Sequence, residues 1–278
     1  MKKITRRSFL AAAGLTAAAL ALTACGGSSS STASSTASSA ASSEAASSSA
    51  AAELTTVEAG KLTMATNATF PPYEMTTDTG AFEGIDVDTA QAIAEKLGLE
   101  LQIDDMEFDA ALLSVQQGKA DIVMAGVTVT DERKAVMDFS DSYATGIQSI
   151  IVPEGSDIAT PDDLAGKKIG TQRGTTGYIY CSDDFGDENV VAYDSGLTAV
   201  QALNNGQVDA VVIDNAPAKE YVAANPGLVI LDTSYAEEDY AIGMAKGSAL
   251  EDAINAALEE LKADGTLQSI VDKYITAE

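Results

Sequence analysis

Short apolar blocks and helical patterns alternate along the chain from about residue 61 onward. The apolar run from Leu62 to Ala65 predicts a buried strand. From Asp86 to Leu97 the apolar residues recur at helical spacing, with Asp86 placed as the N-cap and Gly98 as the stop. Because strand and helix keep alternating, the pattern predicts an α/β fold with mostly parallel sheets.

One arrangement occurs twice, about 88 residues apart. A helical run ends at a glycine, and after a short turn an aspartate opens an apolar strand, first at Gly118 and Asp121 and again at Gly206 and Asp209. This duplication predicts two lobes that are built alike. Ligands of open α/β sheets bind beyond the carboxyl ends of the strands, so two such ends that face each other would form a cleft.

The C-terminal stretch from Ser248 to Tyr274 has the pattern of two helices that are broken at Gly265. One face of the first helix is apolar and is expected to pack on a lobe; it consists of Leu250, Ile254, Ala257, Leu258 and Leu261.

The N-terminus has the pattern of an export signal: four basic residues followed by an apolar run from Phe9 to Leu22 that is too short for a permanent membrane span. The segment Leu22-Thr23-Ala24-Cys25 resembles a bacterial lipobox, which implies cleavage before Cys25 and acylation of its thiol, with palmitate as one typical chain. The alternative is a simple signal peptide with an incidental cysteine. Thr5 to Leu10 also resembles a twin-arginine signal, so the export route stays open.

Residues 26 to about 58 are almost all Ser, Ala, Thr and Gly. Such a segment cannot bury enough apolar surface to offset its chain entropy. We therefore expect a flexible tether over residues 25–58 between the anchor and the folded part.

Charge and composition exclude several classes of function. The 278 residues include 42 acids, 16 bases, two cysteines and no histidine, for a net charge of −26. A nucleic-acid binder needs a basic face, and imidazole-dependent catalysis or a His-ligated zinc site needs histidine, so these are excluded. A disulfide scaffold is excluded as well, because the first cysteine lies in the leader. Neither a cofactor nor a metal is expected, and no catalytic residue is assigned.

Arg133 stands just after a predicted strand, in Thr130-Asp131-Glu132-Arg133. A guanidinium there can bind a carboxylate through two parallel hydrogen bonds. The alternative is a surface arginine that pairs with one of the two preceding acids.

Asp214 directly follows four apolar strand residues. A carboxylate at a strand end can accept hydrogen bonds from an ammonium group. Equally, it can cap the helix that begins at Asn215.

Two further segments follow predicted strands. Gly174-Thr175-Thr176-Gly177 precedes a helical run, and the free N–H groups of a helix start attract anions, although a plain threonine cap explains the pattern too. Phe70-Pro71-Pro72-Tyr73 offers an aromatic wall for a ligand or, alternatively, part of the core.

From about Lys61 to Lys273 the chain resembles the polar-amino-acid-binding proteins of ABC importers, solute-binding protein family 3. The order and spacing of several short motifs carry this resemblance together: Phe70-Pro71-Pro72-Tyr73, Gly84-Ile85-Asp86-Val87-Asp88, Phe108-Asp109-Ala110, Val127 to Arg133, Asp138-Phe139-Ser140, Gly174-Thr175-Thr176 and Gly206 to Asp214.

The resemblance implies roles for the matched polar positions. Arg133 would bind the α-carboxylate of an amino acid, assisted by Thr128 and Thr176. Asp214 would bind the α-ammonium group together with the carbonyl of Gly126.

The resemblance also implies how the ligand side chain is held. Phe70 and Phe108 would sandwich it, and Thr175 belongs to the same helix start as Thr176. Asn67 is neutral where relatives for cationic amino acids often carry an acid, which favours a polar or neutral amino acid, with cystine among the candidates. Arg173 would favour an acidic side chain if it pointed inward.

The family further implies a two-lobed fold that closes on its ligand by a hinge. The expected segments are residues 1–24 (signal peptide), 25–58 (tether), 59–146 with 239–278 (first lobe) and 147–238 (second lobe). The expected protein is a monomer, anchored by lipid on Cys25 to the outer face of the bacterial cytoplasmic membrane or in the periplasm. It would deliver a free amino acid to a permease with its ATPase.

Two other functions fit the same fold. One is an enzyme, such as a dehydratase of cyclic amino-acid precursors, in which carboxylates act as acid and base; the lack of histidine argues against it. The other is a surface sensor without transport. Cys181 has no cysteine partner once Cys25 is lipidated, and it is expected to be a partly buried, small apolar residue.

Overall fold

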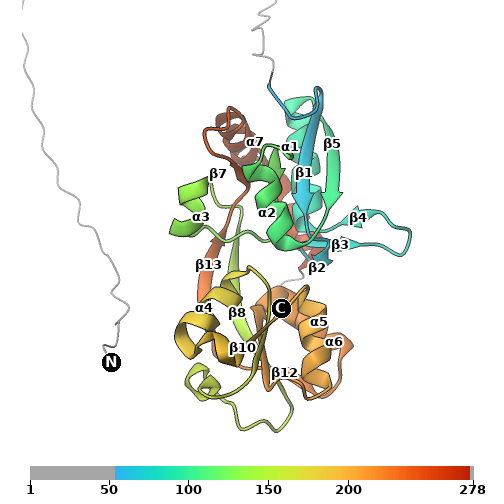
Figure 1. Cartoon of the computed structure of the whole chain (residues 1–278). Helices are drawn as coiled ribbons and strands as arrows, with labels where there is room; N and C mark the ends of the chain where they lie inside the picture. Colours follow the sequence, from blue (N-terminus) through green and yellow to red (C-terminus); the bar gives the residue numbers. More distant parts are fainter. Residues whose placement is uncertain (1–53, 276–278) are drawn as a thin grey trace, which may run out of the picture. The chain divides into compact units, whose positions relative to one another are not determined.

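The computed structural model describes residues 54–275. The predicted signal peptide, Cys25 and most of the tether lie outside these residues. Two large sheets, each with its own helices, form two lobes, and a small third sheet lies beside the first lobe (Figure 1). Within residues 54–275, no helix combines the length and the apolar character that a membrane crossing requires.

The sheet of the first lobe has the order β5-β1-β6-β14-β7. β1 runs parallel to β5 and β6, whereas β14 is antiparallel to β6 and β7. Its strands are β1 (Lys61–Thr66), β5 (Glu100–Asp105), β6 (Ile122–Val123), β7 (Met137–Phe139) and β14 (Gly243–Ala245). The small sheet joins β2 (Thr69–Phe70), β3 (Glu74–Thr76) and β4 (Phe82–Glu83).

Five helices accompany the first sheet. α7 and α8 contact α1, and α2 packs on β1 and β14. The two C-terminal helices therefore belong to the first lobe. The apolar face predicted for the first C-terminal helix is buried. The helices are α1 (Ile85–Leu97), α2 (Phe108–Gln116), α3 (Asp131–Val136), α7 (Glu251–Ala263) and α8 (Thr266–Tyr274).

The sheet of the second lobe has the order β10-β9-β11-β8-β12, and β13 pairs with β8. β9 is parallel to β10 and β11, whereas β8 is antiparallel to β11, β12 and β13. Its strands are β8 (Ala144–Pro153), β9 (Ile169–Gln172), β10 (Val190–Tyr193), β11 (Ala210–Asp214), β12 (Leu228–Ile230) and β13 (Ala236–Tyr240).

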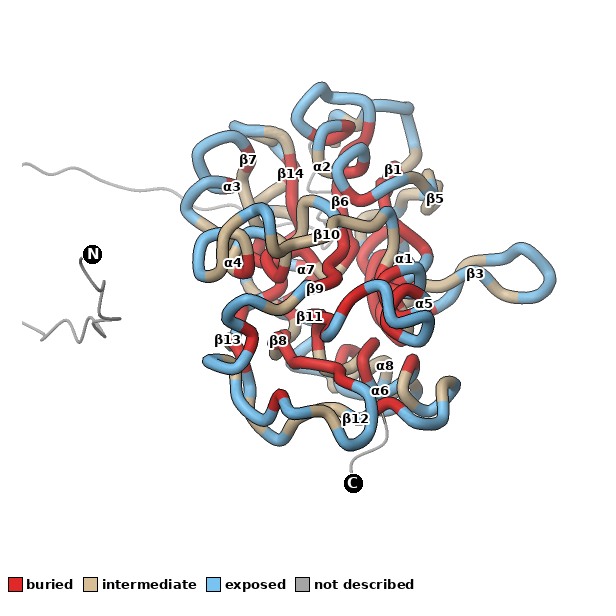
Figure 2. The backbone as a smooth tube through the Cα atoms, turned by 60° about the horizontal axis from the view of Figure 1, so that its bottom comes forward, coloured by how far each residue is buried: buried red, intermediate tan, exposed pale blue. Residues whose placement is uncertain are grey.

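Helices α4 (Thr176–Phe185), α5 (Gly196–Asn204) and α6 (Asn215–Ala224) pack on this second sheet, and two short 3₁₀ turns lie at Pro161–Leu164 and Asp187–Asn189. Figure 2 shows that the central strands of the lobe, β8, β9 and β11, carry mostly buried residues, while the surrounding loops are largely exposed. The apolar surface removed from water along these strands is what stabilises the lobe.

The chain passes between the two sheets twice, once from β7 to β8 and once from β13 to β14. β8 and β13 pair along these crossings, with Gly146 opposite Glu238. A Cβ atom at Gly146 would lie 2.5 Å from the Tyr240 ring, so this close crossing of the strands requires glycine.

The repeated turn predicted from the sequence is confirmed in both lobes. Gly118 and Gly206 both have a φ of 66°, a conformation that favours glycine. Asp121 then accepts a hydrogen bond from Thr63 N at 2.8 Å, and Asp209 accepts one from Lys168 N at 2.7 Å. In each lobe the aspartate therefore ties the start of one parallel strand to the residues at the start of another.

Two sequence-based expectations were wrong in detail. Asp86 is not the N-cap of α1, because Gly84 occupies that position and Asp86 lies fully buried in the first turn. The sheets are mixed rather than mostly parallel, because the crossing strands β8 and β13 and the returning strand β14 enter them antiparallel.

The two strand-opening aspartates predict unequal effects of truncation. Asp121 is buried and also accepts from Val57 N at 2.7 Å, so Asp121→Ala leaves two backbone N–H groups without their acceptor and is expected to cost about 1–3 kcal/mol of unfolding free energy. Asp209→Ala, the matched change at an exposed hydrogen bond, should cost less. Urea denaturation of both variants measures this, and equal losses would contradict it.

Candidate ligand-binding site

A cavity lies where the carboxyl ends of the parallel strands of both lobes meet. Asn67 follows β1, Gly126 follows β6, Gln172 ends β9 and Asp214 ends β11. All nine residues predicted to bind ligand line this one cavity: Asn67, Phe70, Phe108, Gly126, Thr128, Arg133, Thr175, Thr176 and Asp214.

Arg133 comes from α3 in the first lobe and is 8% exposed. Its Nη1 donates to the Thr128 carbonyl at 2.8 Å, and its Nη2 donates to the Gly174 carbonyl of the second lobe at 3.2 Å. The guanidinium also lies 5.4 Å from the Phe108 ring centre. Burial lowers the pKa of Arg133 and the charge of Glu238 opposes this; an arginine remains cationic under such a shift.

Asp214 comes from β11 in the second lobe and is 2% exposed. Its carboxylate accepts from Ala216 N at 3.0 Å, which caps α6, and from Ile147 N at 2.7 Å. Burial raises the pKa of Asp214 to about 6. The helix cap and the cavity-lining position, which were alternatives in the sequence, are both realised.

The neutral part of the cavity wall is also held by specific contacts. Thr175 caps α4, as its alternative interpretation predicted, and places Thr176 in the first turn. Asn67 Oδ1 accepts from Gln172 Nε2 at 2.8 Å. Phe70 stacks on Tyr73 with the ring centres 5.9 Å apart.

Several of these contacts join the two lobes directly. Gln172 reaches Asn67, Tyr221 donates to the Thr69 carbonyl at 2.6 Å, and Arg133 reaches Gly174. The two strand edges therefore stand close enough for a single small solute to touch both.

Comparison with known proteins agrees with this geometry. Residues 62–277 match the sequence profile of the bacterial extracellular solute-binding proteins, family 3. The chain belongs to this family. It is 33% identical over 226 residues to the L-cystine-binding protein TcyJ of Escherichia coli (strain K12), covering 80% of this chain and 85% of the relative.

Two further proteins are similar to this chain. The arginine-binding extracellular protein ArtP of Bacillus subtilis (strain 168) is 33% identical, over 78% of this chain and 87% of the relative. The solved structure of an ancestral arginine-binding protein bound to arginine is 43% identical, with a TM-score of 0.74, covering 78% of this chain and 98% of that one. These relatives are named as amino-acid-binding proteins, which agrees with the predicted solute-binding, non-enzymatic function. The similarity to the solved structure confirms the predicted two-lobed fold.

Sequence reasoning missed two buried acids of this family 3 protein. Glu238 lies on β13, and its Oε2 accepts three hydrogen bonds, each of 3.0 Å, from Thr128, Gln148 and Thr176. In the sequence it stands in an acidic run that is typical of a solvated surface. Its period-two alternation with the buried Tyr240 is the one signal that could have revealed it.

Glu74 is the second missed acid. It follows the aromatic segment at the start of β3, it is fully buried, and it lines the cavity. Burial and the neighbouring Asp86 raise the pKa of Glu74 well above its usual range.

Two residues whose roles the sequence left open lie away from the cavity. Arg173 is more than half exposed and pairs with Asp194 at 3.6 Å, so it does not point inward. Cys181 is fully buried, and burial raises the pKa of its thiol to about 12, which makes it an inert core residue.

The hydrogen bonds of Glu238 predict that two substitutions at this position lower the free energy of unfolding by different amounts. Glu238→Ala removes the acceptor that three buried donors from both lobes share, and it should cost on the order of 2–3 kcal/mol of unfolding free energy. Glu238→Gln keeps one acceptor oxygen and the side-chain volume, so it should cost less. Thermal or urea unfolding compares the two, and a harmless Glu238→Ala would contradict the role.

Proposed function

We propose that the protein captures a free α-amino acid in this cavity and delivers it to the permease and ATPase of an ABC importer. The observation that carries the proposal is that a buried guanidinium of the first lobe and a buried carboxylate of the second line the same cavity. An α-amino acid is a zwitterion whose carboxylate and ammonium match Arg133 and Asp214. Membership of family 3 supports the transport role.

In this proposal the ligand acts by shifting an equilibrium between open and closed lobes. Its two poles contact both lobes only in the closed state, so they stabilise that state. The paired crossing strands β8 and β13 support hinges near residues 146–148 and 238–240, with 59–146 and 239–278 as one lobe and 147–238 as the other. Thr128, Thr176 and Gly126 would complete the contacts to the two poles.

For the ligand side chain we propose a cationic group, with arginine as the first candidate. Asn67 argued for a neutral ligand, but Glu74 adds a buried carboxyl to the same cavity. A guanidinium can satisfy a carboxylate through two parallel hydrogen bonds, and Phe70 and Phe108 supply aromatic faces for its stem. The likeness to arginine-binding relatives supports this choice, and the likeness to TcyJ makes cystine the second candidate.

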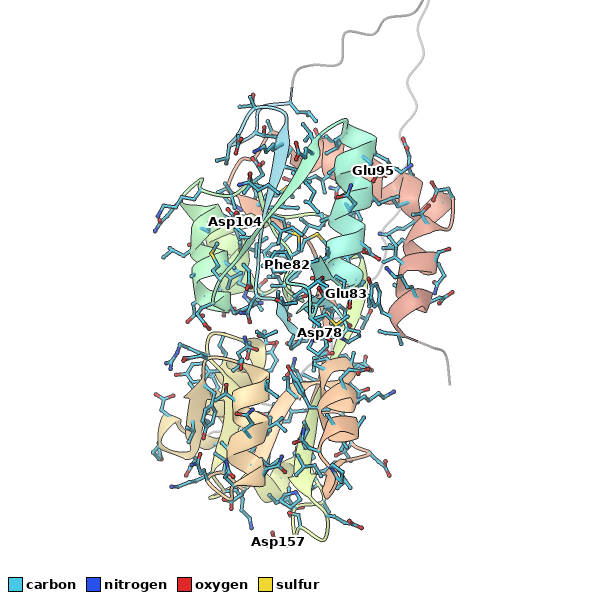
Figure 3. All side chains as sticks on the ribbon, turned by 90° about the vertical axis from the view of Figure 1, so that its right-hand side faces the viewer. Asp78, Phe82, Glu83, Glu95, Asp104 and Asp157 are labelled. Carbon is cyan, nitrogen blue, oxygen red and sulfur yellow. The ribbon has the colours of Figure 1, made fainter. Side chains whose placement is uncertain are left out.

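We also propose that the chain is a lipoprotein at the outer face of the cytoplasmic membrane, as a monomer. The lipobox-like segment ending at Cys25 and the Ser/Ala-rich segment after it support an acylated anchor with a tether. The acidic surface suits an exported, soluble pair of lobes: Figure 3 shows Glu95 on the outside of the first lobe and Asp157 at the far end of the second.

A ligand screen tests the proposed capture of an amino acid. Bound ligand stabilises the folded state by about 2.7 kcal/mol when its concentration is 100 times the Kd, so the cognate amino acid should raise the Tm by several degrees. The panel holds the twenty amino acids and cystine. We expect arginine to give the largest shift, and no shift with any of them would contradict the proposal.

Two variants of Arg133 test its proposed role in binding the ligand carboxylate. Arg133→Ala should weaken binding by about 100-fold or more, because the ligand carboxylate loses its counter-charge in a buried site. Arg133→Lys keeps the charge without the planar fork and should fall between this variant and the wild type. Calorimetric titration measures all three proteins, and an Arg133→Ala protein of unchanged affinity would refute the assigned role.

The anchor is tested separately from the ligand site. Cys25→Ala removes the thiol that would be acylated, so the protein should move from the membrane fraction to the soluble extracytoplasmic fraction while amino-acid binding persists. Fractionation and immunoblotting read this out. A variant that stays with the membrane would argue against lipid attachment at Cys25.

A further inference from the structure

The carboxyl group of Glu74 has an unusual environment. It is fully buried, and no N–H or hydroxyl group within residues 54–275 donates a hydrogen bond to either of its oxygens. The neighbouring acid is Asp86 on α1, whose carboxyl group, together with burial, raises the pKa of Glu74. A carboxylate left in this state would be buried without any compensation, which is costly.

Asp86 is the acceptor in this pair. It is also fully buried, and its two oxygens accept from the Tyr143 hydroxyl at 2.7 Å and from Gly126 N at 2.9 Å. Two carboxyl groups can share a hydrogen bond only when one of them carries a proton. Because the oxygens of Asp86 are already engaged as acceptors, the proton belongs to Glu74, which donates to Asp86.

The surroundings of the pair keep the proton in place. The titratable groups that interact with the pair are acids and phenols: Asp105 at the end of β5, Tyr73 before β3, Tyr143 before β8 and Tyr221 on α6. Arg133, the buried base within the described residues, donates instead to the carbonyls of Thr128 and Gly174. Arg133 is the one base among the described residues that line the cavity, and these two hydrogen bonds direct its guanidinium to backbone carbonyls and not to Glu74.

A cationic ligand would change this balance, because Glu74 lines the cavity, whereas Asp86 is not among the lining residues. We propose that the Glu74–Asp86 carboxyl pair exchanges its proton for the cationic side chain of the ligand, so that each binding event releases a proton to solvent. This inference rests on the proposed function. The O–H bond of Glu74 breaks, the proton passes to water or buffer, and the N–H groups of the ligand donate to the new carboxylate.

The exchange has a defined pH dependence. The proton of Glu74 is held more tightly in the free protein than in the complex, so acid favours the free protein. Affinity for a cationic ligand therefore rises with pH, and it stops rising once Glu74 is ionised in the free protein too. Asp214 contributes a similar rise for every amino acid as pH passes about 6, so a neutral ligand is needed as the reference.

Arginine and citrulline provide the matched pair of probes, because citrulline has the same length and a neutral side chain. Calorimetric titration of the full-length chain in buffers of different ionisation enthalpy counts the protons that each ligand releases. At pH values where Glu74 is still protonated in the free protein, we expect arginine to release up to about one proton more than citrulline. Equal proton release by the two ligands at every pH would overturn the proposal.

The variant Glu74→Gln provides a second test of the proton exchange. Its amide can donate to Asp86 as the protonated acid does, so the variant is expected to fold, and thermal unfolding verifies this. The extra proton release with arginine should vanish in the variant and its arginine affinity should fall by about 10- to 100-fold. An undiminished extra release would assign the proton to another group and overturn the proposal.

The outcomes separate this proposal from the one on which it rests. Arginine that binds without extra proton release overturns the exchange and leaves amino-acid capture standing. Binding of citrulline without arginine overturns both the exchange and the cationic class. Failure of every amino acid to bind overturns the proposed function with it.

Discussion

A buried arginine stays charged and therefore needs hydrogen-bond acceptors around it, and Arg133 has such acceptors in both lobes. One nitrogen is held by the Thr128 carbonyl of its own lobe and another by the Gly174 carbonyl across the cleft. This requirement fixes how the two sheets meet, because the loops after β6 and β9 must approach the same guanidinium. It also leaves the arginine without a carboxylate ion pair in the cavity, the interaction that the α-carboxylate of an amino acid would supply.

The other buried charged groups in and around the cavity are acids, of which Glu74 and Asp214 line it. Glu74, Asp86, Asp214 and Glu238 are all at most 6% exposed, against one buried arginine within the described residues. Such a group of carboxyls is stable only with protons, donors or a cation. Glu238 uses hydroxyl and amide donors from both lobes, Asp214 uses backbone N–H groups, and Glu74 uses a proton. Ligand recognition and lobe closure therefore depend on the same buried charges.

The sequence predicted the fold and the polar poles of the site because both follow local rules. Arg133 and Asp214 could be singled out because each follows a predicted strand, and the duplicated turn indicated two similar lobes. Asp86 was predicted as an N-cap because it stands near the start of a helical pattern. Its carboxyl group instead accepts hydrogen bonds from Tyr143 and Gly126, which are distant in sequence. Glu238 was missed because its acidic run is typical of a solvated surface, and Glu74 because it stands just after the aromatic segment. The burial of both results from contacts between distant elements.

One ligand that binds Arg133 and Asp214 together would hold the two lobes in the closed state. Spin labels at exposed positions of each lobe, Leu113 on α2 and Ile179 on α4, allow the distance between the lobes to be measured in solution. The account predicts that arginine shifts the distance distribution toward its short component in the wild type but not in Arg133→Ala. An unchanged distribution in the wild type at saturating ligand, or the same shift in both proteins, would contradict it.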